Sequence, residues 1–189
     1  MEKTDRRVRY TKMTLRQALL ELMQYKNVEQ ISVAELCRVA DVNRGTFYAH
    51  FNTPQDLLRQ VETEFLNALE PMLEQHSKSG KPMGTYEVVL EIVECIVRDS
   101  DLCKILLGKN GDTGFLRRVL LTAQQSVFSL WEKAVAPDQK PILEYLFTFI
   151  ANGGVGVIQK WIEADMKDSP ETIANVISTM ANYGFQAFL

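Results

Sequence analysis

The strongest constraint on the fold comes from residues 32–58, where three helix-start signals follow one another closely. Ser32 is followed three residues later by Glu35, a capping box in which a hydroxyl and a carboxylate satisfy backbone N–H groups at a helix start. Asn43 suits the cap of a second helix, and Thr53, which precedes a proline, suits the cap of a third. The stretch therefore predicts two short helices joined by a tight turn and followed at once by another helix.

Side-chain types indicate how this turn forms and which faces are buried. Asp41 is expected to turn the chain, because aspartate tolerates a left-handed backbone better than most residues other than glycine. Phe47 and Phe51 are four residues apart and can share a core-facing side. Arg44 and Tyr48 then point towards solvent, where such side chains suit phosphates and base edges. The layout predicts a helix-turn-helix DNA-binding element.

The same stretch resembles the DNA-binding domain of the TetR/AcrR family of bacterial transcription regulators. The matching positions are Ala40, Val42, Asn43, Arg44, Gly45, Thr46, Phe47, Tyr48, His50, Phe51 and Leu57. Two positions depart from the family pattern. Asp41 stands where the turn is usually glycine, which is tolerable, and Pro54 replaces a lysine that often contacts a phosphate in relatives. We expect that phosphate contact to be missing here.

The resemblance and the exposed faces together predict the residues that contact DNA. Arg44 is unfavourable beside a helix N-terminus unless an anion is present, and this favours DNA. Tyr48 as a half-buried core tyrosine is the less favoured alternative, whereas His50 suits core packing and a phosphate equally well. The predicted set is Val33, Asn43, Arg44, Gly45, Thr46, Tyr48 and His50, with Arg6, Arg7 and Arg9 from the leader.

The charge distribution agrees with this prediction. Residues 1–59 hold ten basic and seven acidic residues, whereas the remainder holds eleven basic and seventeen acidic residues. A net charge of −3 thus conceals a basic first segment joined to an acidic body. The leader cluster of Arg6, Arg7, Arg9 and Lys12 is either a solvated tail or a phosphate or minor-groove contact, and the neighbouring motif favours contact with DNA.

The whole chain reads as all-α, because no segment shows sustained strand alternation. The first helix carries a stripe of Leu15, Leu19 and Leu22, and Asn27 is expected to stop the chain in a left-handed conformation. Pro71 is expected to kink or end the helix that starts at residue 54. Further helices are predicted at about 86–97, 102–107, 115–136, 142–166 and from 170 onwards. We predict a three-helix DNA-binding domain over residues 1–56 and a larger helical effector-binding and dimerisation domain over residues 57–189.

The last two predicted helices, about Ile142–Met166 and Pro170–Phe188, are expected to form the homodimer. Gly153, Gly154 and Gly156 lie inside the first of them, where each costs about 1 kcal/mol relative to alanine. Close helix approach would offset that cost, and a plain kink is the alternative. The region from residue 102 to 171 resembles, more weakly, a subgroup that includes regulators of dihydroxyacetone kinase operons.

Little in the sequence supports catalysis. The two histidines, His50 and His76, have no ligand partner at metal spacing, and no glycine-rich phosphate loop follows a strand. We predict no catalytic site, metal or cofactor. Cys37, Cys95 and Cys103 lack paired spacing and are expected to be buried and reduced, with oxidant sensing by Cys95 or Cys103 less favoured. The absence of a secretory leader and of a membrane-length apolar run favours the cytoplasm.

We therefore expect a dimeric, ligand-responsive repressor that recognises a palindromic operator in double-stranded DNA. The effector is an unknown small apolar molecule, and its pocket residues stay unassigned. The alternatives are a regulator or coactivator controlled by a protein partner, and a helical binding or enzyme module that merely retains the DNA-binding element. Aromatic and sulfur side chains that suit either a pocket or a core are Met83, Tyr86, Phe128, Trp131, Tyr145 and Trp161.

Overall fold

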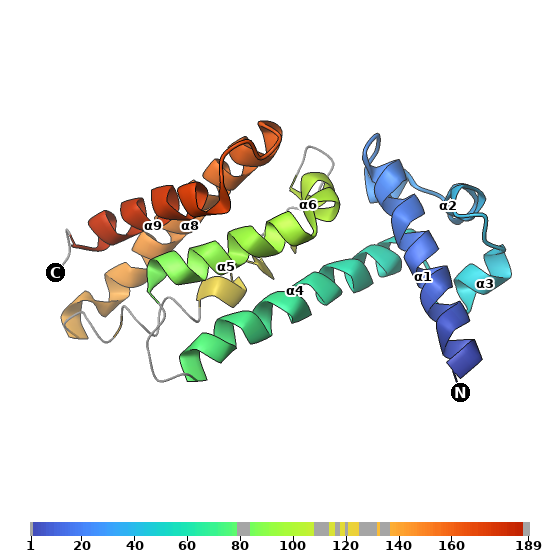
Figure 1. The fold of residues 1–189 in the computed structure, drawn as a ribbon, viewed down its shortest axis with the longest axis horizontal. Helices are drawn as coiled ribbons and strands as arrows, with labels where there is room; N and C mark the ends of the chain where they lie inside the picture. Colours follow the sequence, from blue (N-terminus) through green and yellow to red (C-terminus); the bar gives the residue numbers. More distant parts are fainter. Residues whose placement is uncertain are drawn as a thin grey trace. The chain divides into compact units, whose positions relative to one another are not determined.

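The computed structural model describes residues 2–78, 84–107, 114–115, 118–119, 121–124, 132 and 137–186. Within these ranges the regular structure is helical and no strand occurs (Figure 1). The prediction of an all-α protein is confirmed. The predicted helix over residues 115–136 falls largely outside the described residues.

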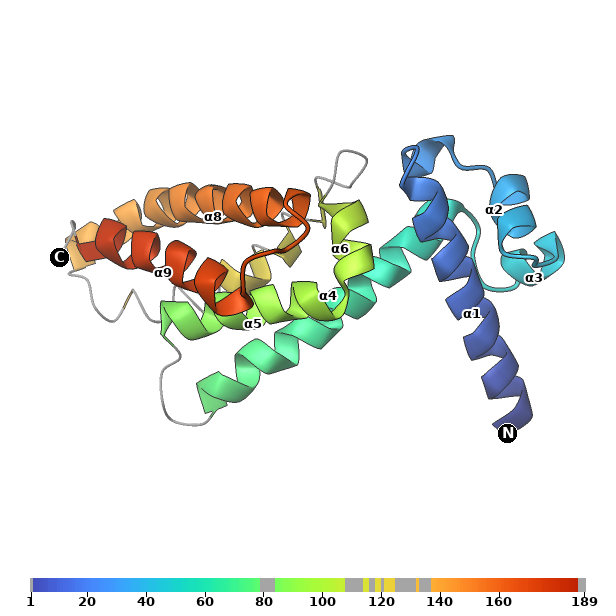
Figure 2. The same ribbon diagram turned by 45° about the horizontal axis from the view of Figure 1, so that its top comes forward.

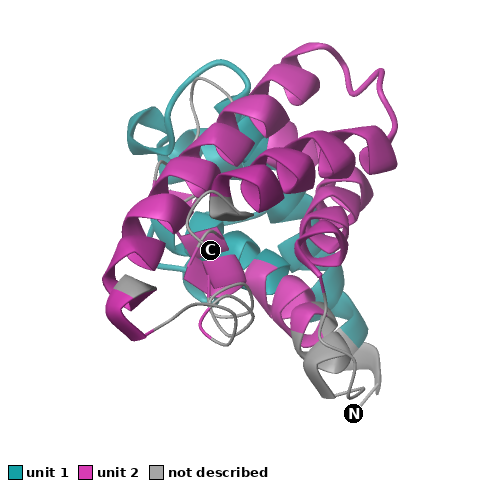
Figure 3. Cartoon of the chain, turned by 90° about the vertical axis from the view of Figure 1, so that its left-hand side faces the viewer, with its two compact units in different colours: residues 1–65, 105–112 teal, residues 66–104, 113–189 magenta. Residues whose placement is uncertain are grey.

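The described residues form the following α-helices (α) and 3-10 helices (η), in chain order. They are α1 (Glu2–Met23), η1 (Val28–Gln30), α2 (Val33–Val39), α3 (Arg44–Tyr48), α4 (Pro54–Lys78), α5 (Thr85–Arg98), α6 (Ser100–Leu106), η2 (Pro137–Gln139), α8 (Lys140–Glu163) and α9 (Pro170–Gln186). The chain forms two compact units, shown in teal and magenta in Figure 3. Unit 1 is Met1–Phe65 with Ile105–Asp112, and unit 2 is Leu66–Lys104 with Thr113–Leu189. The functional boundary near residue 56 stays a prediction.

Unit 1 is built around a small apolar core to which α1, α2, α3 and the start of α4 contribute. α2 packs against both α1 and α3, and Figure 2 shows these three helices together. Its deeply buried side chains include Leu15, Leu19, Leu36, Phe47 and Leu57, each no more than 2% exposed. The leucine stripe predicted from helical spacing is therefore the core-facing side of α1.

Backbone conformation in unit 1 confirms one sequence prediction and corrects another. Asp41 has φ 50°, so the turn between α2 and α3 is left-handed as expected. Asn27 is instead extended, with φ −68°, and caps η1, where its backbone N–H bonds to the Gln30 side chain at 3.2 Å. The leader is also helical: α1 begins at Glu2, so Arg6 and Arg9 belong to a helix and not to a tail.

α4 continues past the proline that was expected to disturb it. The helix spans Pro54–Lys78 with Pro71 inside it, so of the predicted kink or early end, the early end is wrong and the kink stays a prediction. Leu57, Val61 and Phe65 are buried along its unit 1 portion, as the predicted stripe requires. A proline removes one backbone donor, and a helix of this length retains its remaining hydrogen bonds on either side.

In unit 2, α9 packs against both α5 and α8. Gly154 serves close approach within the chain, because a Cβ there would lie 3.3 Å from Cγ2 of Ile177. Trp161 is buried, and its indole N–H donates to the backbone carbonyl of Asp168 at 2.9 Å, which ties the end of α8 to the connection before α9. Trp161 is thus a core residue, whereas Tyr145 is 79% exposed.

α8 corrects the prediction that no segment has the length and apolarity of a membrane span. An 18-residue window within Lys140–Glu163 has a mean hydropathy of 1.4, so by length and composition alone this helix could cross a membrane. Core helices of soluble proteins pass the same test, and a single such helix is weak evidence. Two large apolar side chains of α8, Tyr145 and Phe149, are 79% and 78% exposed.

Candidate nucleic-acid interface

The helix-turn-helix begins at α2, whose start is fixed by two side chains. The Ser32 hydroxyl accepts a hydrogen bond from the backbone N–H of Glu35 at 3.2 Å, as the capping box predicts. The Glu35 carboxylate is paired with the ammonium of Lys26 at 2.6 Å. This ion pair was not predicted from the sequence, because Lys26 and Glu35 are nine residues apart and belong to no common local motif. Lys26 and Glu35 connect the end of α1 to α2.

The turn into α3 is held by backbone and side-chain hydrogen bonds. The N–H of Val42 donates to the carbonyl of Cys37 at 3.0 Å and closes the end of α2. Asn43 then caps α3, because its Oδ1 accepts from the N–H of Gly45 at 2.8 Å. A Cβ on Gly45 would lie only 3.2 Å from that oxygen, so the cap itself favours glycine at this position. These contacts set the direction in which α3 leaves the turn.

The two sides of α3 differ sharply in exposure. Phe47 is fully buried, and its ring lies 5.8 Å from that of Phe51. The adjacent Tyr48 is 58% exposed and meets the Phe47 ring edge-on at 5.6 Å. Arg44 and Thr46 are also exposed. The buried phenylalanine therefore anchors a short helix whose opposite side presents a guanidinium, a hydroxyl and a phenol to solvent.

α4 starts five residues after α3, and its first turn is capped by side chains. The N–H of Asp56 donates to the Thr53 hydroxyl, and the N–H of Thr53 donates to the Asp56 carboxylate, both at 3.1 Å. The Asp56 carboxylate also pairs with Arg59, and these hydrogen bonds hold the pKa of Asp56 below its usual value. Pro54 opens the helix and offers no side-chain donor. The third predicted helix start is confirmed.

The remaining predicted contact residues occupy different positions in unit 1. Arg6, Arg7 and Arg9 are exposed or nearly so along α1, while Val33 is half-buried in the first turn of α2. His50 is half-buried and its ring lies 6.3 Å from that of Phe51, consistent with the packing role considered for it. A phosphate contact by His50, and every DNA contact in this set, stays a prediction.

Comparison with known proteins identifies the class to which this geometry belongs. Residues 15–61 match the family model for bacterial regulatory proteins of the tetR family, and residues 85–183 match the model for a transcriptional regulator C-terminal region. The chain belongs to the TetR family. It is accordingly a DNA-binding transcriptional regulator, and proteins of this family bind DNA and act as dimers.

Solved structures of TetR regulators share the fold of this TetR-family chain. A TetR transcriptional regulator from Streptococcus agalactiae 2603V has a TM-score of 0.67 at 21% identity, over 94% of this chain and 97% of that one. The dihydroxyacetone kinase operon activator DhaS has a TM-score of 0.60 at 19% identity, over 94% and 97%. The fatty acid degradation regulator FadR from Bacillus halodurans has a TM-score of 0.58 at 15% identity, over 90% and 94%. No curated protein sequence matches the chain.

The described residues hold no group of three or more His, Cys, Asp or Glu side chains arranged for a metal ion. The related proteins named above are transcription regulators, a class that is not enzymatic. The exposed side chains of α3 offer a guanidinium, a hydroxyl and a phenol, which can hydrogen-bond to phosphates and base edges.

Proposed function

We propose that this TetR-family protein is a dimeric repressor that binds a palindromic operator and releases it when a small effector binds. The observation that carries the proposal is the two-sided α3, with Phe47 fully buried and Arg44, Thr46 and Tyr48 exposed. A helix anchored in this way can enter the major groove with its polar side towards the bases. Asn43 and Gly45 form the capped start of α3, and we include both in the proposed interface.

The basic residues of α1 supply the sequence-independent part of binding in this proposal. Arg6, Arg7 and Arg9 are presented by a helix, where only Arg6 and Arg9 share a side, and we propose that all three contact phosphates. Each lost phosphate contact lowers the slope of log affinity against log salt by about 0.9. That slope, measured on a non-specific duplex, should become smaller in each of three variants: Arg6→Gln, Arg7→Gln and Arg9→Gln. Unchanged slopes would show that these arginines do not contact DNA.

We propose that two copies of the chain associate through α8 and α9. Tyr145 and Phe149 on α8 are 79% and 78% exposed, and Met180 and Tyr183 on α9 are both 69% exposed. Their spacings of four and three residues place each pair on one side of its helix. An apolar surface of this kind indicates a protein interface.

Two of the glycines of α8 support the same interface. A Cβ at Gly153 or Gly156 would meet nothing within 4 Å, so packing inside the protomer does not explain them. Both follow Phe149 at helical spacing on its exposed side, where they would let a partner helix approach closely. Gly154 has a different role, since it faces Ile177 of the same chain.

Sedimentation velocity tests the dimer without reference to DNA. Phe149→Asp should convert the dimer to a monomer, because it places a carboxylate in the centre of an apolar contact. Tyr25→Asp is the matched control, since Tyr25 is 80% exposed but lies in unit 1. Equal sedimentation of both variants and the wild type would contradict the proposed interface. A detergent-free dimer would also account for the apolar surface of α8 without a membrane.

Selection from a randomised duplex pool tests the operator. A two-fold dimer presents two copies of α3, so the enriched sequences should be palindromic with half-sites about 10 base pairs, or a multiple of this, apart. Enrichment of a single asymmetric half-site would contradict the dimeric reading. Repression follows if the selected site overlaps a promoter and its removal raises transcription. We place this activity in the cytoplasm, where the operator lies.

The control signal has two candidate sources. We propose a small effector bound in the helical body of residues 57–189, which would shift the population away from the DNA-binding state. The alternative is a protein partner that docks on the acidic part of the chain after residue 59. Purified protein that binds the operator and is released by a small molecule supports the first. Operator binding that requires a second protein supports the alternative.

A further inference from the structure

Asn152 lies in the middle of α8, on the side of the helix that carries its exposed aromatic residues. It follows Phe149 by three residues and Tyr145 by seven, so the three side chains project from one side of α8 over two turns. Asn152 is exposed, as Tyr145 and Phe149 are. One amide therefore stands beside two large apolar side chains on the proposed dimer surface.

The folding of a single protomer does not explain an asparagine at this position. Asn152 is far from both ends of a helix of 24 residues, so it caps neither end, and asparagine is a poorer helix former than alanine. Its Nδ2 donates to the backbone carbonyl of Thr148 at 2.7 Å. Among the described residues the side chain makes no other hydrogen bond. One N–H and the oxygen Oδ1 of the amide are therefore left for a partner.

The chemistry of an amide suits contact with a copy of itself. Once the apolar side of α8 is covered, the remaining N–H and Oδ1 of Asn152 lose water and need hydrogen-bond partners. In a two-fold dimer, a residue beside the axis lies opposite its own copy. Two asparagines there can each donate an N–H to the oxygen of the other, which satisfies both amides at once.

The glycines beside Asn152 allow this contact to form. A Cβ at Gly153 or Gly156 would meet nothing within 4 Å, so the space beside both is open in the protomer. Asparagine is short, and two of them meet only where the helix backbones approach closely, as glycine permits. If the two copies of α8 run in opposite directions past an axis beside Asn152, then Phe149 lies against the partner's Gly156. A large ring would then meet the smallest residue.

We propose that Asn152 pairs with Asn152 of the partner subunit across the two-fold axis, and that this pair makes the interface select a second copy of the same chain. The proposal rests on the proposed dimer through α8 and α9 and names its centre. The exposed aromatic residues supply most of the buried apolar surface, while the amide pair sets the register. A chain with an apolar residue at this position would leave one amide unsatisfied, so a mixed dimer is disfavoured.

Exchange of charge at residue 152, followed by sedimentation velocity of the full chain, tests the pairing. Asn152→Asp and Asn152→Lys should each weaken the dimer by at least about tenfold, because two like charges then meet at the axis. An equimolar mixture of the two variants should recover the dimer, because the carboxylate of one chain then meets the ammonium of the other. Recovery in the mixture cannot come from a variant that has failed to fold.

Asn182 provides the matched control. It is also an exposed asparagine, and it lies on α9 two residues after Met180 and one before Tyr183, which places it on a different side of that helix. Asn182→Asp and Asn182→Lys should therefore each sediment as the wild-type dimer does.

Native mass spectrometry of mixed chains tests the selectivity. Asn152→Leu should still form a dimer, since a buried polar pair contributes specificity more than affinity. When it is mixed with an equal amount of wild type and allowed to exchange, the mixed dimer should fall clearly below the share of about half that random pairing gives. A mixed dimer at the random share would overturn the selective role of Asn152.

The outcomes separate the pairing from the dimer on which it rests. A wild-type monomer, or a dimer that Phe149→Asp leaves intact, would overturn both. The pairing alone is overturned if Phe149→Asp disrupts the dimer but Asn152→Asp and Asn152→Lys stay dimeric. It is also overturned if both of these variants are monomers and their mixture stays monomeric, because residue 152 would then not face its own copy.

Discussion

Two adjacent aromatic residues in α3 should respond in opposite ways to the same truncation. Phe47 is fully buried and lies against Phe51, whereas Tyr48 is 58% exposed. Phe47→Ala removes a ring from the core of unit 1, while Tyr48→Ala removes a ring that mostly contacts solvent. The first change should destabilise unit 1, and the second should leave it folded but impair DNA binding.

The magnitudes follow from burial. Truncating a buried phenylalanine costs about 3–5 kcal/mol, through lost burial and the cavity that remains. Tyr48→Ala loses an edge-on contact with Phe47, for which about 0.5–1.5 kcal/mol is expected. A unit of about 70 residues has a free energy of unfolding of roughly 4–10 kcal/mol. Phe47→Ala therefore removes a large share of the stability of unit 1.

The assay must report on unit 1 separately. Both tryptophans, Trp131 and Trp161, lie in unit 2, so tryptophan fluorescence would follow the wrong part of the molecule. Hydrogen–deuterium exchange read by mass spectrometry resolves peptides from residues 15–65. Because about 1.4 kcal/mol corresponds to a factor of ten, Phe47→Ala should accelerate exchange of the most protected amides by roughly two to more than three orders of magnitude.

Tyr48→Ala should accelerate the same amides by about tenfold at most. The reasoning is refuted if Phe47→Ala changes exchange in residues 15–65 by less than Tyr48→Ala does. It is also refuted if peptides from α8 and α9 respond to Phe47→Ala as strongly as those from unit 1, since the loss would then not be local.

Further perturbations test the caps, the left-handed positions and the buried thiols. Asn43→Ala removes the cap of α3 and should destabilise unit 1 by about 1 kcal/mol in the same exchange experiment. Asp41→Gly, at φ 50°, should stabilise unit 1 by up to ~1 kcal/mol. Effects of the opposite sign would contradict the cap and the left-handed turn. Met166→Gly, at φ 52°, should likewise raise the urea midpoint of unit 2 followed by tryptophan fluorescence, and a lowered midpoint would argue against strain there. Burial raises the pKa of the Cys37 and Cys95 thiols, so little thiolate forms at pH 8. Iodoacetamide should therefore alkylate both thiols at least about tenfold more slowly in the folded chain than in the urea-unfolded chain. Equal alkylation rates would contradict their burial.

The parts of the fold that local chemistry determines could be predicted from the sequence. Ser32, Asn43 and Thr53 each cap a helix through a bond to a residue two or three positions away, so their signal lies within a few residues. The left-handed turn at Asp41 is local in the same sense. These features are enough to place α2, α3 and the start of α4.

The misplaced features depend on competition between conformations or on distant partners. Asn27 suits both a left-handed stop and an N-cap, and the Gln30 side chain decides in favour of the cap. The leader joins α1 because nothing in its sequence ends a helix, and charge clustering alone did not indicate this. Pro71 disturbs α4 too little to end it.

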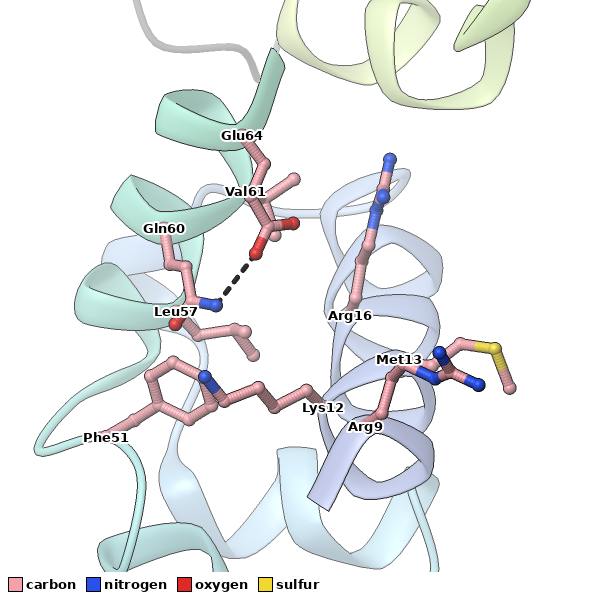
Figure 4. Close-up of a pocket in the computed structure, with 9 residues that line it drawn as sticks. All are labelled: Arg9, Lys12, Met13, Arg16, Phe51, Leu57, Gln60, Val61 and Glu64. Atoms are coloured by element: carbon pink, nitrogen blue, oxygen red, sulfur yellow. Dashed lines mark hydrogen bonds between the residues drawn. The ribbon is translucent and has the colours of Figure 1, made fainter. Parts of the chain in front are cut away.

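The most informative surface features needed three dimensions. The groove between α1 and α4 brings Lys12 together with Phe51, Leu57 and Val61 (Figure 4). These three residues are distant from Lys12 in the sequence. Only the structure distinguishes the neighbours of the α8 glycines. Gly154 faces Ile177, whereas a Cβ at Gly156 would meet no atom within 4 Å. Sequence spacing identified the glycines as a group and could not assign them different neighbours.

The central claim is that α3 reads the operator, and fluorescence anisotropy on the selected operator tests it most directly. Tyr48→Ala and Thr46→Ala should each weaken operator binding by about 1–3 kcal/mol or more per half-site, while affinity for a non-specific duplex stays unchanged. Tyr25→Ala, which removes another exposed tyrosine of unit 1 (80% exposed, against 58% for Tyr48), should bind the operator like the wild type. Operator affinity that survives both α3 substitutions would contradict the account.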